Sequence, residues 1–189
     1  MTIREIISVP DPRLKKISQP VDKVTEKTRE LMDDMLETMY AAKGIGLAAI
    51  QIGIEQRVIV MDLSPSETED ETDRQDRYDL SDEIDEGPRF FVNPEIVWTS
   101  EETSNYQEGC LSVPGFYDDV ERPIACRVQF LDYDGQKQEV ECEGLLATCI
   151  QHEMDHLNGI VFLDHLSRLK RDRIVSKMRK LNKEKARLA

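Results

Sequence analysis

The chain has 189 residues, enough for one domain with a sizeable core, and a formal net charge of −13. No apolar run is long enough to span a bilayer, and the first residues soon reach Pro10 and Pro12 without a long apolar stretch. These features argue against a membrane protein and against a signal peptide. We therefore expect a soluble, cytoplasmic protein whose four cysteines are free thiols or metal ligands rather than disulfides.

The charge is unevenly distributed along the chain. Residues 64–88 hold eleven acidic residues and two arginines, a net charge of −9, whereas residues 168–189 hold ten basic and two acidic residues, a net charge of +8. The acidic total argues against DNA and general nucleic-acid binding, but the basic end could meet a polyanion by itself. Residues 64–88 have almost nothing to bury, so we expect a solvated acidic insertion within a single domain of residues 1–189.

The first half of the chain predicts an arm, a helix and two strands. Residues 1–23 contain three prolines and indicate an irregular arm laid over the body. From about 25 to 42 the apolar residues follow a helical period, with methionines expected in the core, and Gly44 suits the positive φ that often follows a helix. The apolar composition at 56–63 and 90–98 predicts strands.

A short glycine-containing segment, Gly-Ile-Gly-Leu-Ala-Ala-Ile-Gln, occupies residues 44–51. Gly44 and Gly46 permit a close backbone approach, while the absence of a third glycine argues against a dinucleotide-binding fingerprint. Gln51 is the one polar group in a mostly apolar run, and a buried amide must be satisfied by protein or by ligand. By itself, the segment is more simply a turn that leads into buried structure.

The second half of the chain predicts a hairpin and two helices. The segments 124–133 and 136–142 flank an Asp-Gly pair, which is a strong signal for a two-residue hairpin turn. A helix is expected from Gly144 to about residue 158, where Asn-Gly ends it. A final helix, from about 167 to 185, places apolar residues against ten basic ones and could be an ordinary solvated amphipathic helix.

The expected helix after Gly144 contains Gln-His-Glu-Met-Asp-His. On a helix, His152 and His156 lie one turn apart on the same face and can share one metal ion, while the neighbouring Glu153 can reach a water on that metal. This His-Glu-x-x-His arrangement lets two imidazoles bind a divalent cation and a carboxylate handle protons. The alternative is a pair of solvent-facing histidines on an ordinary helix.

A catalytic metal with an open coordination position needs at least a third protein ligand. Cys110, within Glu-Gly-Cys-Leu-Ser, is the soft donor in the most suitable context, although a lone cysteine is most often a small buried side chain. We expect Cys149 to form a wall of the pocket, with a role as metal ligand as the second possibility. As a fourth ligand it would complete a closed structural site. Glu153 favours the open site, because a structural site has no use for a base. His165 has no matched partner and stays outside the site.

Three segments together resemble the motifs of peptide deformylases, in the same order and at similar spacing. They are Gly-Ile-Gly-Leu-Ala-Ala-Ile-Gln at 44–51, Glu-Gly-Cys-Leu-Ser at 108–112 and Gln-His-Glu-Met-Asp-His at 151–156. The basic C-terminal helix resembles that of the bacterial type I enzymes, and the acidic insertion is longer than expected for the family. We expect an α+β fold: small antiparallel sheets packed around a central metal-binding helix, with the basic helix outside.

The resemblance implies a hydrolase that removes the N-formyl group from the formyl-methionine of newly synthesised polypeptides and releases formate. It assigns one divalent metal, Fe²⁺ in the cell, to Cys110, His152 and His156; thiolate and imidazole donors also suit Zn²⁺ and Ni²⁺. By analogy, the Gln51 amide and the Leu111 backbone N–H stabilise the developing oxyanion. Glu153 takes the water proton and passes it to the departing amine.

Substrate recognition can also be outlined from the sequence. The glycines Gly46 and Gly109 resemble positions where the family pairs backbone groups with an extended peptide. For the methionine side chain, the expected apolar walls are Ile45, Leu146, Cys149 and the stem of Glu108. The resemblance further implies that the basic helix docks on the ribosome, near the exit of the nascent chain.

Two other functions fit part of the sequence. A metallopeptidase of the His-Glu-x-x-His class would usually recruit a third ligand downstream of the helix, and His165 is poorly spaced for that role. A zinc-stabilised binding module would close its site with Cys149 and would unfold without metal. Loss of activity on mutating Glu153 separates an enzyme from such a module.

Overall fold

The structure, a computed structural model, describes residues 2–64 and 87–188. Expectations for the acidic insertion lie outside the described residues, apart from its first and last positions. The helices are α1 (Glu26–Ala41), α3 (Gly144–Leu157) and α4 (Arg168–Leu188), with short 3₁₀ helices η1 (Pro12–Lys15), η2 (Ala49–Ile52) and η3 (Phe162–His165). The strands are β1 (Gly46–Ala48), β2 (Val58–Met61), β3 (Arg89–Thr99), β4 (Thr103–Gly109), β5 (Tyr117–Pro123), β6 (Ala125–Leu131) and β7 (Lys137–Glu143).

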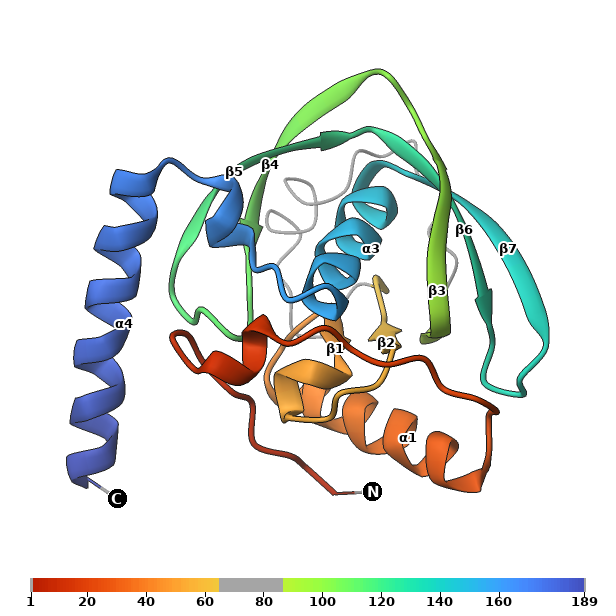
Figure 1. Ribbon diagram of the computed structural model, residues 1–189, viewed down its shortest axis with the longest axis horizontal. Coiled ribbons are helices and arrows are strands. Elements are labelled where there is room, and N and C mark those ends of the chain that lie inside the picture. The colour runs from red at the N-terminus through yellow and green to blue at the C-terminus, as the bar shows by residue number, and fades with distance from the viewer. Residues whose placement is uncertain (1, 65–86, 189) are drawn as a thin grey trace.

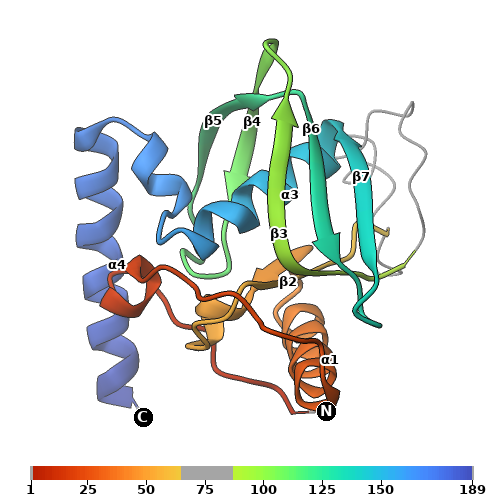
Figure 2. The ribbon, with the colours of Figure 1, turned by 45° about the vertical axis from the view of Figure 1, so that its right-hand side comes forward.

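The expected α+β architecture is confirmed. A five-stranded antiparallel sheet has the order β1-β2-β3-β6-β7, and a second sheet consists of β4 and β5. Figures 1 and 2 show α3 at the centre with strands arching around it, α1 beneath, and α4 standing to one side. The predicted hairpin is β6–β7, turning at Gly135 with φ +80°. The β4–β5 pair was not predicted, because its largely exposed, polar residues lack the apolar alternation of a half-buried strand.

Helix α1 forms where its apolar period predicts it. The side chain of Thr28 accepts a hydrogen bond from the Thr25 N–H at 3.1 Å and so helps to cap the first turn. The prediction about the end of the helix was wrong in detail, since Lys43 takes the positive φ of 56°. Gly44 is needed for space instead, because a Cβ there would lie 2.6 Å from Leu111 Cδ1.

Three apolar clusters surround the centre of the molecule. The first packs α3 against the large sheet, around Phe91 and Ile150. The second lies between α1 and strands β1 and β2, where Met32 and Met35 are fully buried, as expected of core methionines. The third joins the N-terminal arm, η3 and the buried face of α4. Among the described residues, no helix is both long and apolar enough to cross a membrane.

The N-terminal arm is laid over the body, as its composition predicted. The Ile7 N–H donates to the Gln51 carbonyl at 2.7 Å, and the Val9 N–H donates to the Ser112 carbonyl at 2.9 Å. The arm therefore joins the segment that contains Gln51 to the segment that contains Cys110. These contacts help to fix the relative positions of two segments that are far apart in the sequence.

The beginning of the arm is tied to α1 through Asp34. Its carboxylate accepts from the Thr2 N–H at 2.6 Å and from Arg4 Nη2 at 2.7 Å, and these bonds hold the pKa of Asp34 below its ordinary value of 3.8. A carboxyl with a lowered pKa in the folded state stabilises the fold above its unfolded pKa, and the contribution is lost as the pH falls.

We therefore expect Asp34→Asn to lower the free energy of unfolding by about 1–2 kcal/mol at pH 7. Urea denaturation of both proteins from pH 7 to pH 3 measures the difference. The difference in unfolding free energy between wild type and variant should stay constant while Asp34 is ionised in both the folded and the unfolded wild-type protein. It should then narrow as the pH falls below the ordinary pKa of 3.8. A gap that stays constant down to pH 3 would contradict this role of Asp34.

Candidate metal centre and active site

Three donor side chains meet where the end of β4 faces α3. The ligand atoms of Cys110, His152 and His156 all lie within 4.8 Å of one another. Cys110 Sγ is 3.2 Å from His156 Nε2. The two histidines come from successive turns of α3, as the i, i+4 spacing predicted. The structure therefore brings together the three predicted ligands, and it buries both imidazoles rather than exposing them.

The cysteine is held by a tight turn after β4. The Val113 N–H donates to the Cys110 carbonyl at 2.9 Å, and the Ser112 N–H lies 3.4 Å from the Cys110 sulfur. Gly109 pairs with Tyr117 across the small sheet, and a Cβ at Gly109 would lie 2.4 Å from the Tyr117 ring. Without a side chain at 109, this ring can lie against the strand directly beside the donors.

Glu108 determines how His152 faces the other donors. Its Oε2 accepts from His152 Nδ1 at 2.7 Å, which leaves Nε2 of the same ring for a metal ion. Arg122 donates to both carboxylate oxygens, through Nη2 at 3.0 Å and through Nε. Burial alone would raise the pKa of Glu108, but the bonds with His152 and Arg122 outweigh it and lower the pKa to about 2. From the sequence, Glu108 was predicted to line the methionine pocket with its apolar stem. In the structure its carboxylate has the more specific role, because it orients His152 and pairs with Arg122.

The donors fit a divalent cation. Burial alone would lower the pKa of His152, but its hydrogen bonds with Cys110 and Glu108 raise it well above the ordinary value, so a bound metal ion would take the place of the proton on this ring. Burial and the neighbouring charge of His152 lower the pKa of His156, which favours the neutral, ligating form. His156 Nδ1 is buried without a hydrogen-bond partner in the described part of the chain. One thiol and two imidazoles form a donor set suited to Zn²⁺, Fe²⁺ or Ni²⁺.

Glu153 lies beside the donors with one free carboxylate oxygen. The side chain is buried, and within residues 2–64 and 87–188 its Oε2 has no hydrogen-bond partner. Burial raises the pKa of Glu153 to about 7. The backbone of Gly46 approaches the carboxylate so closely that a Cβ there would lie 2.6 Å from Oε1. The close approach expected of the glycine segment is therefore made to this carboxylate.

The Gln51 amide is satisfied by the protein. Its Oε1 accepts from the Ala48 N–H at 2.8 Å. Its Nε2 donates to Ser112 Oγ at 3.2 Å and lies 3.6 Å from the Cys110 sulfur. Gln51 is 1 % exposed, and these contacts hold its NH₂ group next to the sulfur donor. A donor fixed at this place needs no rearrangement to meet charge that develops beside the metal position.

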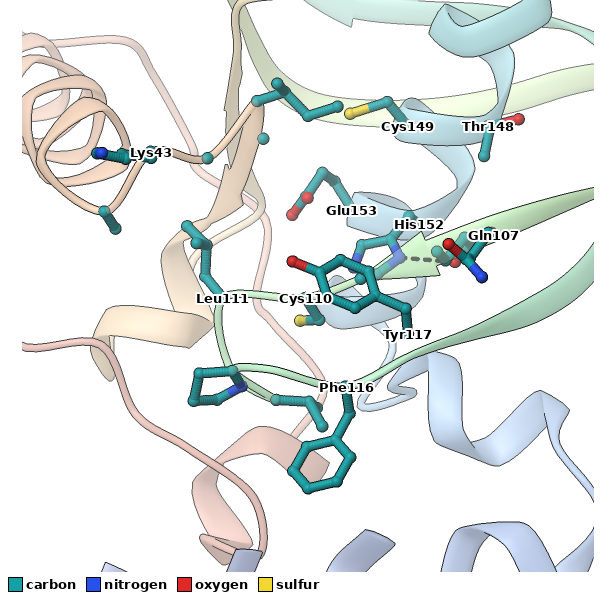
Figure 3. Close-up of a pocket in the computed structure, with 18 of the residues that line it drawn as sticks. Lys43, Gln107, Cys110, Leu111, Phe116, Tyr117, Thr148, Cys149, His152 and Glu153 are labelled. Atoms are coloured by element: carbon teal, nitrogen blue, oxygen red, sulfur yellow. Dashed lines mark hydrogen bonds and ion pairs between the residues drawn. The ribbon is translucent and has the colours of Figure 1, made fainter. Parts of the chain in front are cut away.

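A cavity of about 520 Å³ opens over Glu153 and the donors. Figure 3 shows Cys110, His152 and Glu153 facing the interior, with Leu111 and Tyr117 close by and Phe116 farther out. The cavity is lined by most of the predicted site residues, namely Ile45, Gly46, Glu108, Gly109, Cys110, Leu111, Cys149, His152 and Glu153. Gln51 and His156 are not part of this lining, but Gln51 Nε2 and His156 Nε2 lie 3.6 Å and 3.2 Å from the Cys110 sulfur.

One predicted wall residue is wrong. Leu145, not Leu146, lines the cavity, and Leu146 packs against the core cluster under the large sheet. Neighbouring helical residues differ in direction by about 100°, so a shift of one position moves a side chain to another face. Leu145 precedes Cys149 by four residues and could have been identified from that spacing.

Arg122, whose guanidinium is buried against Glu108, was not predicted from the sequence. Its strand β5 alternates exposed and buried positions, and Val120 and Arg122 share the buried face. The sequence of this strand does not show the alternation, because Arg122 stands in a charged run in which nothing predicts its burial. Phe116 and Tyr117 at the cavity were also missed, because single aromatic residues, one partly buried and one exposed, give no periodic signal in the sequence.

The fold and the cavity together define a class of protein. A buried carboxylate beside a three-donor group with an open position can accept the proton of a water molecule that the metal acidifies. This combination characterises metal-dependent hydrolases.

Comparison with known proteins narrows the class. The sequence model of the polypeptide deformylase family matches residues 3–172. The peptide deformylase of Phenylobacterium zucineum is 56% identical over 180 residues, which cover 95% of this chain and 97% of that protein. The peptide deformylase of Maricaulis maris is 55% identical over 187 residues, which cover 99% of this chain and 98% of that protein. The chain belongs to the peptide deformylase family, whose enzymes remove the N-formyl group from nascent polypeptides.

Solved structures agree with this assignment. The peptide deformylase of Ehrlichia chaffeensis superposes with a TM-score of 0.84 at 44% identity, covering 96% of this chain and 97% of the other. The same enzyme in complex with actinonin gives 0.84 at 45% identity, with 95% and 98% covered. The Legionella pneumophila enzyme gives 0.82 at 42% identity, with 98% and 99% covered. Membership of this family accounts for the site, so the two alternative functions considered from the sequence, a metallopeptidase and a zinc-stabilised module, are not needed to explain it.

Glu108 should be required both for stability and for metal binding. In Glu108→Gln, Arg122 loses its buried carboxylate partner and keeps only Asp155, so we expect the metal-free protein to be about 3 kcal/mol less stable in urea. Metal affinity, measured by competition with a chelator, should fall roughly 10- to 100-fold. The matched control is Glu141→Gln, because Glu141 also pairs with an arginine, Arg127, but on the surface. Equal effects in both variants would contradict the assignment.

Gly46 should be required for activity more than for folding. In Gly46→Ala, the added methyl would lie 2.6 Å from Glu153 Oε1 and 3.1 Å from Cys149 Sγ, so the carboxylate must move. We expect kcat/KM for a formyl-methionyl tripeptide to fall on the order of 10- to 100-fold. Metal content, measured by elemental analysis, should stay at the wild-type value. Unchanged kcat/KM in a folded variant would show that the position of this carboxylate is not critical.

Proposed function

We propose that this chain, as a single domain of residues 1–189, binds one divalent ion through Cys110, His152 and His156 to carry out deformylation. The observation that carries the proposal is the free, buried oxygen of Glu153 next to these three donors. The resemblance to the family favours Fe²⁺ in the cell, while the donors would also accept Zn²⁺ or Ni²⁺. Because its substrates are new polypeptides, we place the reaction in the cytoplasm.

When bound, the ion would supply Lewis-acid chemistry, acidifying water and polarising the formyl carbonyl. Glu153 would take the proton of the attacking water and return it to the amine nitrogen as the C–N bond breaks. Its pKa of about 7 suits a group that must both accept and donate a proton near neutral pH. The products are formate and a free methionyl amino group.

Two donors would stabilise the oxyanion of the formyl group. One is the Gln51 side-chain NH₂, which lies beside the Cys110 sulfur. The other is the Leu111 backbone N–H, for which the described residues provide no hydrogen-bond partner. Loss of one such donor typically costs about 3–4 kcal/mol of transition-state stabilisation.

The substrate peptide would lie along β4. In the described part of the chain β4 pairs with β5 on one side, so its other edge could accept an extended peptide next to Gly109. Pairing of this kind reads the peptide backbone and tolerates varied sequence. The methionine side chain would enter the cavity beside Ile45, Leu145 and Cys149.

Replacement of Glu153 tests the mechanism directly. We expect Glu153→Gln to release formate from a formyl-methionyl tripeptide about 10²- to 10⁴-fold more slowly than wild type, because the amide cannot accept the proton. The assay is anaerobic with Fe²⁺ supplied, and the variant must be folded and metal-loaded. Wild-type rates from the variant would remove Glu153 from the mechanism, and no release from metal-loaded wild type would overturn the proposed function.

We also propose that α4 docks on the ribosome. Its ten basic residues are mostly exposed, whereas Ile174 and Met178 pack into the cluster with the arm and η3. Lys170 pairs with Asp118 at 2.7 Å, and the ammonium of Lys177 lies 5.8 Å from the centre of the Phe116 ring. The helix is thus held against the body with most of its charge turned outward. Deleting residues 168–189 would uncover the apolar cluster, so charge removal is the better test.

A triple variant, Arg173→Gln, Arg179→Gln and Lys183→Gln, should weaken binding to ribosomes and reduce its salt dependence. Three lost phosphate contacts correspond to a decrease of about 2–3 in the slope of log K against log salt concentration. Sedimentation with ribosomes at several salt concentrations measures both quantities. The control removes the same charge from the body with Lys23→Gln, Lys27→Gln and Lys137→Gln, which are also exposed. Equal weakening by both triple variants would contradict docking through α4.

A further inference from the structure

The short helix η3 contacts the end of α3 through two side chains. The Phe162 ring stacks on the His152 ring, with 6.3 Å between the centroids and 26° between the planes. His165 Nε2 donates to Asp155 Oδ2 at 2.7 Å. The helix itself is fixed by Asp164, which accepts from the Val161 N–H at 2.9 Å. One short element therefore presents two groups to the helix that carries the metal donors.

The bond from His165 is the outermost of a continuous series that ends on His152. Asp155 Oδ2, which accepts from His165, also accepts from Arg122 Nη1 at 2.9 Å. Arg122 holds both oxygens of Glu108, and Glu108 Oε2 accepts from His152 Nδ1 at 2.7 Å. Side-chain exposure falls from 35% at His165 through 18% at Asp155 and 7% at Arg122 to 3% at Glu108. The series runs from the surface to a metal donor.

We propose that His165 is a positioning residue for His152. Arg122 lies between the carboxylates of Glu108 and Asp155. Its guanidinium can donate to both oxygens of Glu108 only while the guanidinium plane keeps its orientation. By holding Oδ2 of Asp155, His165 keeps the outer carboxylate turned toward Arg122. The inner carboxylate then keeps the His152 ring turned toward the other donors, while Phe162 packs on the face of the same ring. This inference rests on the proposed metal centre.

A purely structural role would differ in one respect. If the bond between His165 and Asp155 only attached η3 to α3, its removal would lower stability without a specific effect on the metal. A positioning role changes how firmly the ion is held and how fast the reaction runs. The peptide is bound elsewhere, so KM should not change.

The experiment uses the full chain loaded with Co²⁺ and compares two variants of His165 with one control. His165→Ala removes the donor, and His165→Gln restores an N–H that can reach Asp155. Lys15→Met is the matched control, because Lys15 pairs with Asp164 on the same short helix but lies outside the series. For each protein, the rate of Co²⁺ loss to excess chelator, the Co²⁺ absorption spectrum, the melting temperature, kcat and KM are measured.

We expect His165→Ala to lose Co²⁺ about 3- to 10-fold faster than wild type, a smaller effect than that of removing a direct partner of a ligand. Its spectrum should shift and its kcat should fall at unchanged KM. His165→Gln should recover most of these losses, and Lys15→Met should match wild type. If His165→Ala loses Co²⁺ no faster than Lys15→Met, the inference is wrong.

Failure of the metal centre is recognised separately. Cys110→Ser, tested in the same assay, should hold Co²⁺ far less firmly than wild type. If it holds the ion as wild type does, the proposed centre is wrong and the role of His165 fails with it. If it loses the ion while His165→Ala does not, the role of His165 alone is overturned.

Discussion

The site depends on one buried interaction, in which Glu108 joins Arg122 to His152. A carboxylate that is almost fully buried is costly unless its charge is paired and its oxygens are hydrogen-bonded, and Glu108 satisfies both conditions. The interaction connects β4, β5 and α3 at one point. It also fixes which nitrogen of His152 faces Cys110 and His156. It is one of several bonds between the small sheet and α3, together with Gln151 to the Pro123 carbonyl and Arg122 to Asp155, and it is the one that reaches a metal donor directly.

Helix α3 is buried on nearly all sides, which explains why its polar residues are so closely partnered. Gln151 donates to the Pro123 carbonyl at 3.0 Å and to the Ala147 carbonyl at 2.8 Å, and His152 is held by Glu108. Two buried side-chain atoms of this helix have no hydrogen-bond partner within the described residues, Glu153 Oε2 and His156 Nδ1, and both belong to the site. With Gln151 and His152 satisfied, the free Glu153 oxygen beside the three donors is able to accept a proton, which is the basis of the role proposed for it.

Local patterns predicted much of the fold correctly. The methionine-rich stripe of α1, the Asp-Gly hairpin and the helical spacing of His152 and His156 all depend on neighbours a few residues apart, and the structure contains each of them. The β4–β5 sheet was not predicted, because its pairing does not require an apolar face. The choice of Leu146 over Leu145 failed because wall residues depend on how the helix is rotated against its neighbours.

The sequence by itself determined that His152, Glu153 and His156 lie together, because His-Glu-x-x-His on a helix constrains these three side chains through local geometry alone. It also indicated Cys110 and Gln51, although only as members of separate segments. The tertiary structure alone decided that Arg122, Asp155 and His165 continue the site outward to the surface. These contacts join residues from different elements, and their formation depends on burial and on distances in space, which sequence spacing does not encode.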